Sequence, residues 1–128
     1  MANILLIEPD RVLAQIYCQS LNEAGHIVTP CASAKAAVLA ADQQTPDLVI
    51  LELQLIEHSG IEFLYEFRSY TEWQNIPVIL HTQVPAGEFA GNWQLLRDEL
   101  GATAYLYKPL TSLQGLSRAI NESLSLPV

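Results

Sequence analysis

Hydrophobic residues gather in five short runs along the chain, at residues 3–7, 26–31, 48–51, 76–80 and 102–107. Short apolar runs that are rich in Val, Ile and Leu are typical of strands buried on both faces. The central run, Leu48 to Leu51, follows Pro46, and only Glu52 separates it from Leu53. We therefore predict five buried strands, with a carboxylate at the end of the third.

Between these runs, apolar residues recur three or four positions apart, which is the spacing of one helix face. Five helices are predicted by this spacing: Leu13 to Ala24, Ala34 to Ala41, Ile61 to Phe67, Phe89 to Leu100 and Leu113 to Leu124. Asp10 and Ser33 are suitable N-caps, and Thr111 with Gln114 has the pattern of a capping box. Gly25 and Gly101 are predicted to end helices, since glycine tolerates the left-handed backbone found there.

Strands that alternate with helices at this length predict an α/β fold in which helices cover both faces of a parallel sheet. Right-handed crossovers leave few arrangements, and the flavodoxin-like strand order 2-1-3-4-5 is a common one. We expect a single domain over residues 1–128, a doubly wound (βα)5 sheet with no internal repeat or linker.

The charge of the chain narrows the classes of partner. Fourteen acidic residues against six basic ones give a formal charge of −8. This balance argues against binding to nucleic acid or to an anionic membrane, because both need a basic surface. No run approaches the roughly 18 apolar residues of a membrane span. Cys18 and Cys31 are too few for a disulfide framework, so we expect a cytoplasmic protein with free thiols.

Several polar side chains are predicted to meet at one edge of the sheet. Parallel strands all end on the same side, and open α/β sheets bind their ligands there. The residues that follow the strands are Glu8 and Asp10, Glu52, Thr82 and Lys108. Each alone could be a solvated residue at a strand end, whereas the ordered set indicates a site.

These segments resemble the receiver domain of two-component response regulators, a CheY-like family. Ile4–Asp10 is similar to the first strand and acidic turn of the family, and Pro46–Gly60 to its third strand and phosphoacceptor loop. Pro77–Thr82 is similar to the fourth strand with its switch hydroxyl, and Gly101–Pro109 to the fifth strand with its lysine. The resemblance covers essentially the whole chain. It implies a signalling module rather than an enzyme.

The resemblance also implies a role for individual residues. In the family an aspartate accepts a phosphoryl group from a kinase histidine, while Mg²⁺ is held by the acidic turn. This places the phosphoacceptor equivalent at Glu52, the switch pair at Thr82 and Tyr105, and the phosphoryl-contacting lysine at Lys108. The metal set would be Glu8, Glu52 and the backbone of Gln54, with Asp10 nearby in the acidic pocket, and the Lys108–Pro109 bond would be cis.

Two departures affect the same chemistry. Glu52 is one methylene longer than aspartate, roughly 1.5 Å of extra reach, and phosphoryl transfer depends on positioning. Pro9 stands where the family has a second acid, so Mg²⁺ binding is expected to be weak or absent and no other cofactor is expected. Ile56 also replaces a family proline. These changes indicate an atypical receiver, or pseudo-receiver.

Three versions of a receiver remain open. Glu52 could pair with Lys108 and stand in for a phosphoaspartate, or it could be only structural, or it could still be phosphorylated as a working switch. The expected partner is a sensor kinase or effector protein bound on the fourth helix, fifth strand and fifth helix, with a homodimer through that surface as the alternative. The exposed residues expected there are Gln94, Arg97, Asp98, Tyr107, Gln114 and Arg118.

Two other classes of protein are alternatives to the receiver. A flavodoxin-like cofactor-binding protein would share the fold, but its phosphate loop would fall on the acidic segment Glu8–Arg11, which would repel phosphate. A His-carboxylate metal site could use His58 or His81 with Glu52 or Glu57, although single histidines are more often surface or strand-end residues.

Overall fold

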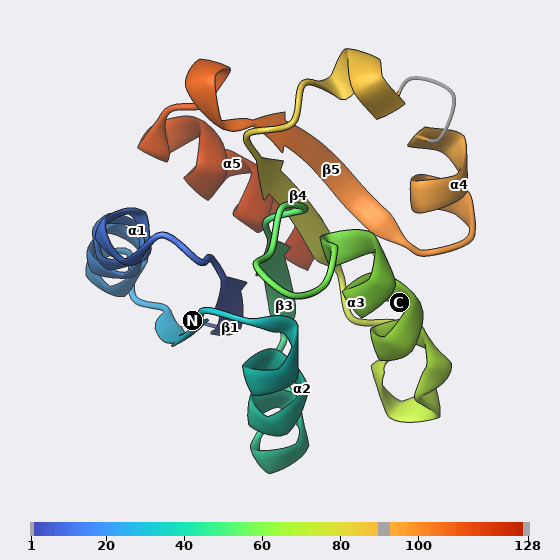
Figure 1. Ribbon diagram of the computed structural model, residues 1–128. Helices are drawn as coiled ribbons and strands as arrows, with labels where there is room; N and C mark the ends of the chain where they lie inside the picture. Colours follow the sequence, from blue (N-terminus) through green and yellow to red (C-terminus); the bar gives the residue numbers. More distant parts are fainter. Residues whose placement is uncertain (1, 90–92, 127–128) are drawn as a thin grey trace.

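A parallel sheet organises the chain in the computed structural model, which describes residues 2–89 and 93–126 (Figure 1). Its strands are β1 (Asn3–Ile7), β2 (Ile27–Cys31), β3 (Leu48–Leu51), β4 (Val78–Thr82) and β5 (Ala102–Tyr107). They pair in parallel in the order β2-β1-β3-β4-β5. The predicted doubly wound fold and strand order are confirmed.

Helices cover both faces of this sheet (Figure 1). The helices are α1 (Arg11–Glu23), α2 (Ala34–Gln43), α3 (Gly60–Ser69), α4 (Trp93–Asp98) and α5 (Leu113–Leu124), and short 3-10 turns are η1 (Thr71–Trp73), η2 (Ala86–Phe89) and η3 (Lys108–Leu110). One hydrophobic core holds the residues of α2, α3 and α4 that face the sheet, and the other holds those of α1 and α5. The sheet therefore separates two cores.

Strand β3 lies in the middle of the sheet and is fully buried. Its side chains alternate, so that Val49 and Leu51 enter the first core while Leu48 and Ile50 enter the second. Burying each such side chain contributes about 1.5–3 kcal/mol. The packing on both faces fixes the register of β3, and with it the position of Glu52 at the end of the strand.

The predicted N-cap residues can be compared with the observed helix ends. The Asp10 side chain accepts hydrogen bonds from the backbone N–H groups of Val12 and Leu13, as predicted for an N-cap. Ser33 likewise caps α2. The predicted capping box is wrong by one residue. Ser112 caps α5, whereas the Thr111 hydroxyl donates to the backbone carbonyl of Tyr107 at 2.8 Å.

The structure corrects the sequence prediction at β4, at the fourth helix and at Pro109. Strand β4 begins at Val78 and includes His81 and Thr82, because the backbone pairing with β5 continues to Thr82. The predicted fourth helix is η2 followed by the short α4, with residues 90–92 outside the described part. No cis peptide bond occurs among the described residues, so the expected cis Lys108–Pro109 bond is wrong. Pro109 instead lies in the first turn of η3, a position that suits proline.

Candidate functional site

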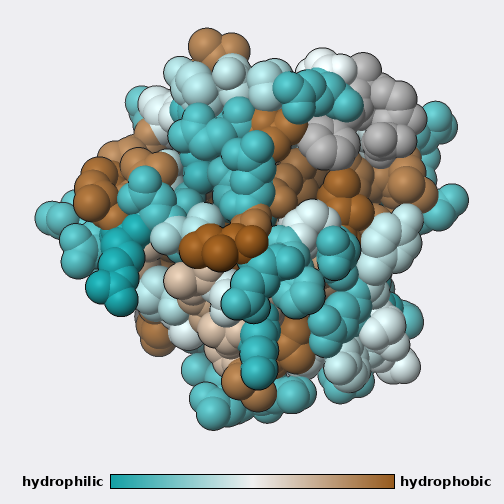
Figure 2. Space-filling model, viewed as in Figure 1, coloured by the Kyte–Doolittle hydropathy of each residue, from teal (hydrophilic) through white to brown (hydrophobic). Residues whose placement is uncertain are grey.

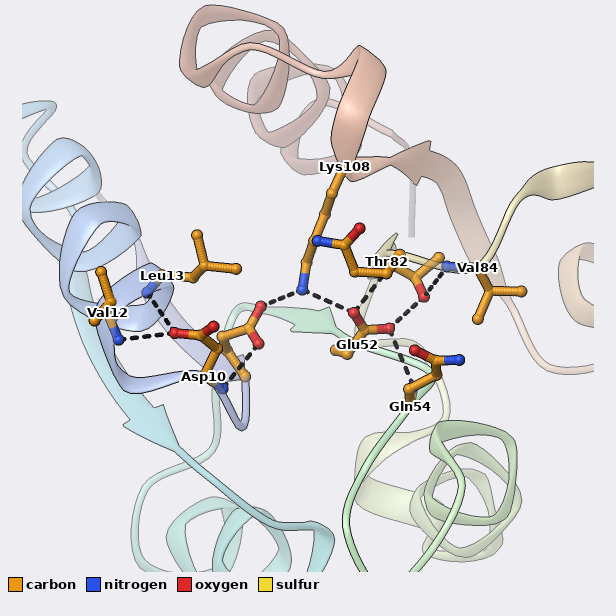
Figure 3. Close-up of polar contacts among 10 residues, drawn as sticks. Asp10, Val12, Leu13, Glu52, Gln54, Thr82, Val84 and Lys108 are labelled. Atoms are coloured by element: carbon orange, nitrogen blue, oxygen red, sulfur yellow. Dashed lines mark hydrogen bonds and ion pairs between the residues drawn. The ribbon is translucent and has the colours of Figure 1, made fainter.

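The site lies at the carboxyl edge of the sheet, where the loops after four adjacent strands meet (Figure 3). Glu8 follows β1, Glu52 follows β3, Thr82 ends β4 and Lys108 follows β5. All four side chains contact at least one other member of the set. The sequence placed these residues at one edge, and the structure brings them into direct contact.

Lys108 is shared between two carboxylates. Its Nζ donates to Glu52 Oε1 at 2.7 Å and also contacts Glu8 Oε1. The side chains are only 5% exposed for Lys108 and 3% for each glutamate. Charges buried to this degree need partners, since removing one partner leaves an uncompensated charge. Two carboxylates and one ammonium leave this cluster with a formal charge of −1.

The Glu52 carboxylate receives four hydrogen bonds. Oε1 accepts from Lys108 Nζ and from the backbone N–H of Gln83 at 3.1 Å. Oε2 accepts from the Thr82 hydroxyl and from the backbone N–H of Gln54 at 3.0 Å. A carboxylate offers about four lone-pair sites, two on each oxygen. The acceptor capacity of Glu52 is therefore filled by the protein itself.

The pKa shifts of Glu52 and Lys108 both favour the ionised forms of these side chains. Burial alone would raise the pKa of Glu52, but hydrogen bonds from Lys108, Thr82 and Gln54 outweigh it and lower that pKa overall. Burial alone would lower the pKa of Lys108, and its bonds to Glu52 and Glu8 reverse this, so its pKa is raised. The carboxylate and the ammonium therefore remain charged around neutral pH.

The hydroxyls of Thr82 and Tyr105 are connected through one backbone segment. The N–H of Val84 donates to Thr82 Oγ1 at 3.1 Å, and Tyr105 Oη donates to the carbonyl of Val84 at 2.7 Å. The Tyr105 ring also meets the Trp93 ring edge-on, with centroids 6.0 Å apart. Contacts thus continue from Glu52 through the loop after β4 to the start of α4.

The donor set does not fit Mg²⁺, which requires near-octahedral oxygen coordination. Pro9 supplies no carboxylate, and Asp10 is engaged as the α1 cap. Glu8 and Glu52 are both bound to the Lys108 ammonium. Within residues 2–89 and 93–126, no three His, Cys, Asp or Glu side chains are grouped to hold a metal, which also leaves the His-carboxylate alternative unsupported.

Sequence reasoning missed two contributors to the site, the backbone N–H of Gln83 and the ring of Tyr17, and it considered His81 only as a metal ligand. The backbone N–H of Gln83 has no side-chain signature, so only the loop geometry reveals it. His81 and Tyr17 form an edge-to-face ring pair, with centroids 4.9 Å apart. His81 is buried, and its Nδ1 has no hydrogen-bond partner among the described residues. Burial first, then the nearby Lys108 charge, lowers its pKa to about 4, so it is neutral here.

The sequence matches the response regulator receiver domain family over residues 4–121. The chain therefore belongs to this family. Its members are signalling modules that interact with kinases and effector proteins. Among the described residues, none of the helices combines the length and apolar character needed to cross a membrane.

The chain is also similar in sequence to individual transcriptional regulatory proteins. The probable transcriptional regulatory protein TcrX of Mycobacterium tuberculosis is 33% identical over 66% of this chain and 36% of its own length. The KDP operon transcriptional regulatory protein KdpE of Escherichia coli is 29% identical over 85% of this chain and 45% of its own. The chain thus spans less than half the length of these two relatives.

The fold also matches a solved structure closely. The chemotaxis protein CheY4 of Vibrio cholerae superimposes with a TM-score of 0.84 over 96% of this chain and 98% of that one, at 22% identity. At this identity the likeness concerns the fold alone.

Proposed function

We propose that this chain is an atypical receiver module that is not phosphorylated in the usual way and acts through protein-protein contacts. In this proposal the Glu52 carboxylate takes the place that a phosphoryl group has in the family. The observation that carries the proposal is the set of four donors on Glu52, which includes Thr82 and Lys108. The family resemblance gives these two side chains the task of contacting a phosphoryl group.

The same contacts disfavour phosphoryl transfer to Glu52. A nucleophilic oxygen needs a free lone pair aligned with the phosphorus, whereas both oxygens of Glu52 accept two hydrogen bonds. Attack would require Glu52 to leave Thr82 or Lys108 while remaining buried. The donor set also lacks the geometry for Mg²⁺, which neutralises charge in phosphoryl transfer. We therefore assign the module no catalytic role and no cofactor.

The contacts of the switch residues support a permanently active-like state. Thr82 already faces Glu52, and Tyr105 is held inward on the carbonyl of Val84. A carboxylate carries one negative charge against about 1.5 to 2 for a phosphate, so the imitation is partial. The free thiols of Cys18 and Cys31 agree with the reducing cytoplasm, where we place the protein.

Replacing Glu52 with glutamine tests this proposal, because the amide keeps the shape of the side chain and loses the charge and one acceptor. We expect NMR amide shifts at Thr82, Val84 and Tyr105 to change, and Trp93 fluorescence to shift with the Tyr105 ring. The matched control is Glu57→Gln, an exposed glutamate in the same loop. If the amide shifts of Thr82, Val84 and Tyr105 in Glu52→Gln match those of wild type, Glu52 does not hold the switch residues.

A further inference from the structure

A cavity of about 760 Å³ lies at the amino edge of the sheet, where the strands begin, opposite the edge that carries Glu52. It is formed by residues that precede β3, β4 and β5 and by the ends of α3 and α5. Its volume is within the range of about 300–1,000 Å³ that is typical of small-molecule sites. We refer to this space as the amino-edge cavity.

The amino-edge cavity differs from the outer surface of the molecule. On the face drawn in Figure 2, hydrophobic side chains stand in separate places with hydrophilic side chains between them. Scattered apolar residues of this kind are ordinary on a folded protein. A concave space that is lined by apolar side chains and a few polar groups is instead typical of a site for a small molecule.

Arg68, in the last turn of α3, brings a positive charge to this cavity. Three backbone carbonyls hold its guanidinium: Nε donates to Leu100 at 2.7 Å, Nη1 to Trp73 at 2.6 Å and Nη2 to Gly101 at 3.3 Å. In the part of the chain that the structure describes, no carboxylate lies within ion-pair distance of Arg68. A guanidinium carries five N–H donors, so one on Nη1 and one on Nη2 remain for a ligand.

The burial of Arg68 favours an anionic ligand. Burial lowers the pKa of Arg68 to about 10, so the side chain is still protonated at neutral pH. A charge that is taken out of water without a counter-charge is costly. The three carbonyls satisfy hydrogen bonds but neutralise no charge. A carboxylate could supply the missing negative charge and accept both remaining donors, since pairs of arginine with carboxylate are frequently bidentate.

Apolar side chains line other parts of the cavity. Ile76 is buried, whereas Leu124 and Leu126 are 36% and 53% exposed. These two leucines lie at the end of α5 and just after it. An apolar group that covered them would leave water together with them, which favours binding. The cavity therefore combines one cation with an apolar wall.

The remaining polar groups disfavour a second acidic group on the ligand. Thr103 Oγ1 donates its hydrogen to the carbonyl of Val78 at 3.2 Å, so in its 2.8 Å bond with Ser123 the serine is the donor. Both hydroxyls can then only accept further hydrogen bonds. Asp47, an exposed carboxylate, also lines the cavity and would repel an anion. A ligand with a single acidic group is thus a better match than a polyanion.

We propose that the amino-edge cavity binds a small organic acid that has one carboxylate and an apolar body. The carboxylate pairs with Arg68, and the apolar body covers Leu124 and Leu126. The site is formed without Glu52 and lies at the other edge of the sheet. The inference therefore goes beyond the proposed function and does not depend on it.

Octanoate is the probe, titrated into the full chain at neutral pH and followed by NMR amide shifts. We expect saturable changes at Arg68, Gly101 and Leu126. Octanol and octylamine carry the same tail without the carboxylate. They should bind at least roughly tenfold more weakly, because the charge-assisted hydrogen bonds to Arg68 are lost.

Two variants separate the charge from the apolar wall. Arg68→Met should lose octanoate binding, but it also removes the three bonds to the backbone, so thermal melting must show that it folds. Leu126→Asp keeps those bonds, places a negative charge on the wall and should weaken binding roughly tenfold. The matched control is Leu39→Asp on α2, where the leucine is 57% exposed and does not line the cavity, and it should bind as wild type does. If Arg68→Met does not fold, Leu126→Asp decides.

Several results would overturn the proposal. They are equal affinities for octanoate, octanol and octylamine, equal octanoate affinities for wild type and Leu126→Asp, and amide shifts confined to residues outside the amino edge. Absence of any saturable shift with octanoate would also overturn it. Phosphorylation of Glu52 would change none of these measurements, so a failure here is distinct from a failure of the proposed function.

Discussion

Replacing Lys108 with methionine removes an ammonium that both buried carboxylates, Glu8 and Glu52, contact. Methionine keeps much of the length and apolar volume of the lysine stem, so the change acts mainly on charge. Glu8 and Glu52 would remain 3% exposed without their cation. We therefore expect the variant to fold with much reduced stability.

The size of the effect follows from the burial of the pair. Removing one partner of a buried ion pair costs about 3–5 kcal/mol. For a chain of 128 residues this corresponds to a fall in melting temperature of roughly 10–20 °C. The control is Arg97→Met, which breaks the exposed pair between Arg97 and Asp98. Exposed pairs contribute about 0–1 kcal/mol, so the control should melt close to wild type.

Urea unfolding at several pH values tests the direction in which the free energy of unfolding changes with pH. In wild type the pKa of Glu52 is lower in the folded than in the unfolded state. This difference stabilises the fold at pH values above the unfolded-state pKa of a glutamate, and the stabilisation is lost as the pH falls through the folded-state pKa. The raised pKa of Lys108 contributes stability that is lost only at strongly alkaline pH. Without the ammonium, burial should raise the pKa of Glu52, so Lys108→Met should gain stability relative to wild type as the pH falls from 7 to 5. A Lys108→Met variant as stable as Arg97→Met would refute the buried ion pair.

Three further changes probe the surroundings of the site. His81→Leu should stabilise the protein by removing an unpaired buried nitrogen. Burial lowers the pKa of His81 in the folded state to about 4. The free energy of unfolding of wild type, measured in urea titrations, should therefore fall by about 2 kcal/mol between pH 6.5 and pH 5, and the variant should not show this fall. Tyr105→Phe removes the bond to Val84 and should cost about 1 kcal/mol with altered Trp93 fluorescence, and unchanged fluorescence would argue against the link. Asp10→Ala should lower the unfolding free energy by about 1 kcal/mol through loss of the α1 cap, as measured by denaturation.

The sequence was sufficient to predict the sheet because the apolar runs that indicate its strands are local and uninterrupted. The uninterrupted apolar run of β3 predicts burial on both faces, and alternation with helices then limits the topology. Glu8, Glu52, Thr82 and Lys108 could be placed at one edge for the same reason. The shared edge follows from parallel pairing and needs no knowledge of side-chain contacts.

Features that depend on the detailed backbone could not be read from the sequence. The α5 cap falls on Ser112 instead of Thr111, since both hydroxyl residues precede the helix and only the backbone geometry selects one. The bond from the Gln83 backbone to Glu52 depends on how the loop turns after β4. His81 is a polar residue within a buried strand, so periodicity alone did not predict its place beside Tyr17.

The central claim is that Glu52 takes the place of a phosphoryl group, and intact-mass measurement with acetyl phosphate and Mg²⁺ tests it most directly. The samples are wild type, Glu52→Asp, and Glu52→Asp combined with Pro9→Asp, which restores both acids of the family pattern. We expect no phosphoryl adduct on wild type, and an adduct on the double variant because its shorter acceptor leaves room for the group and its second acid supports the metal. An adduct on wild type that Glu52→Ala abolishes would contradict the account and identify the chain as a working phosphorylation switch.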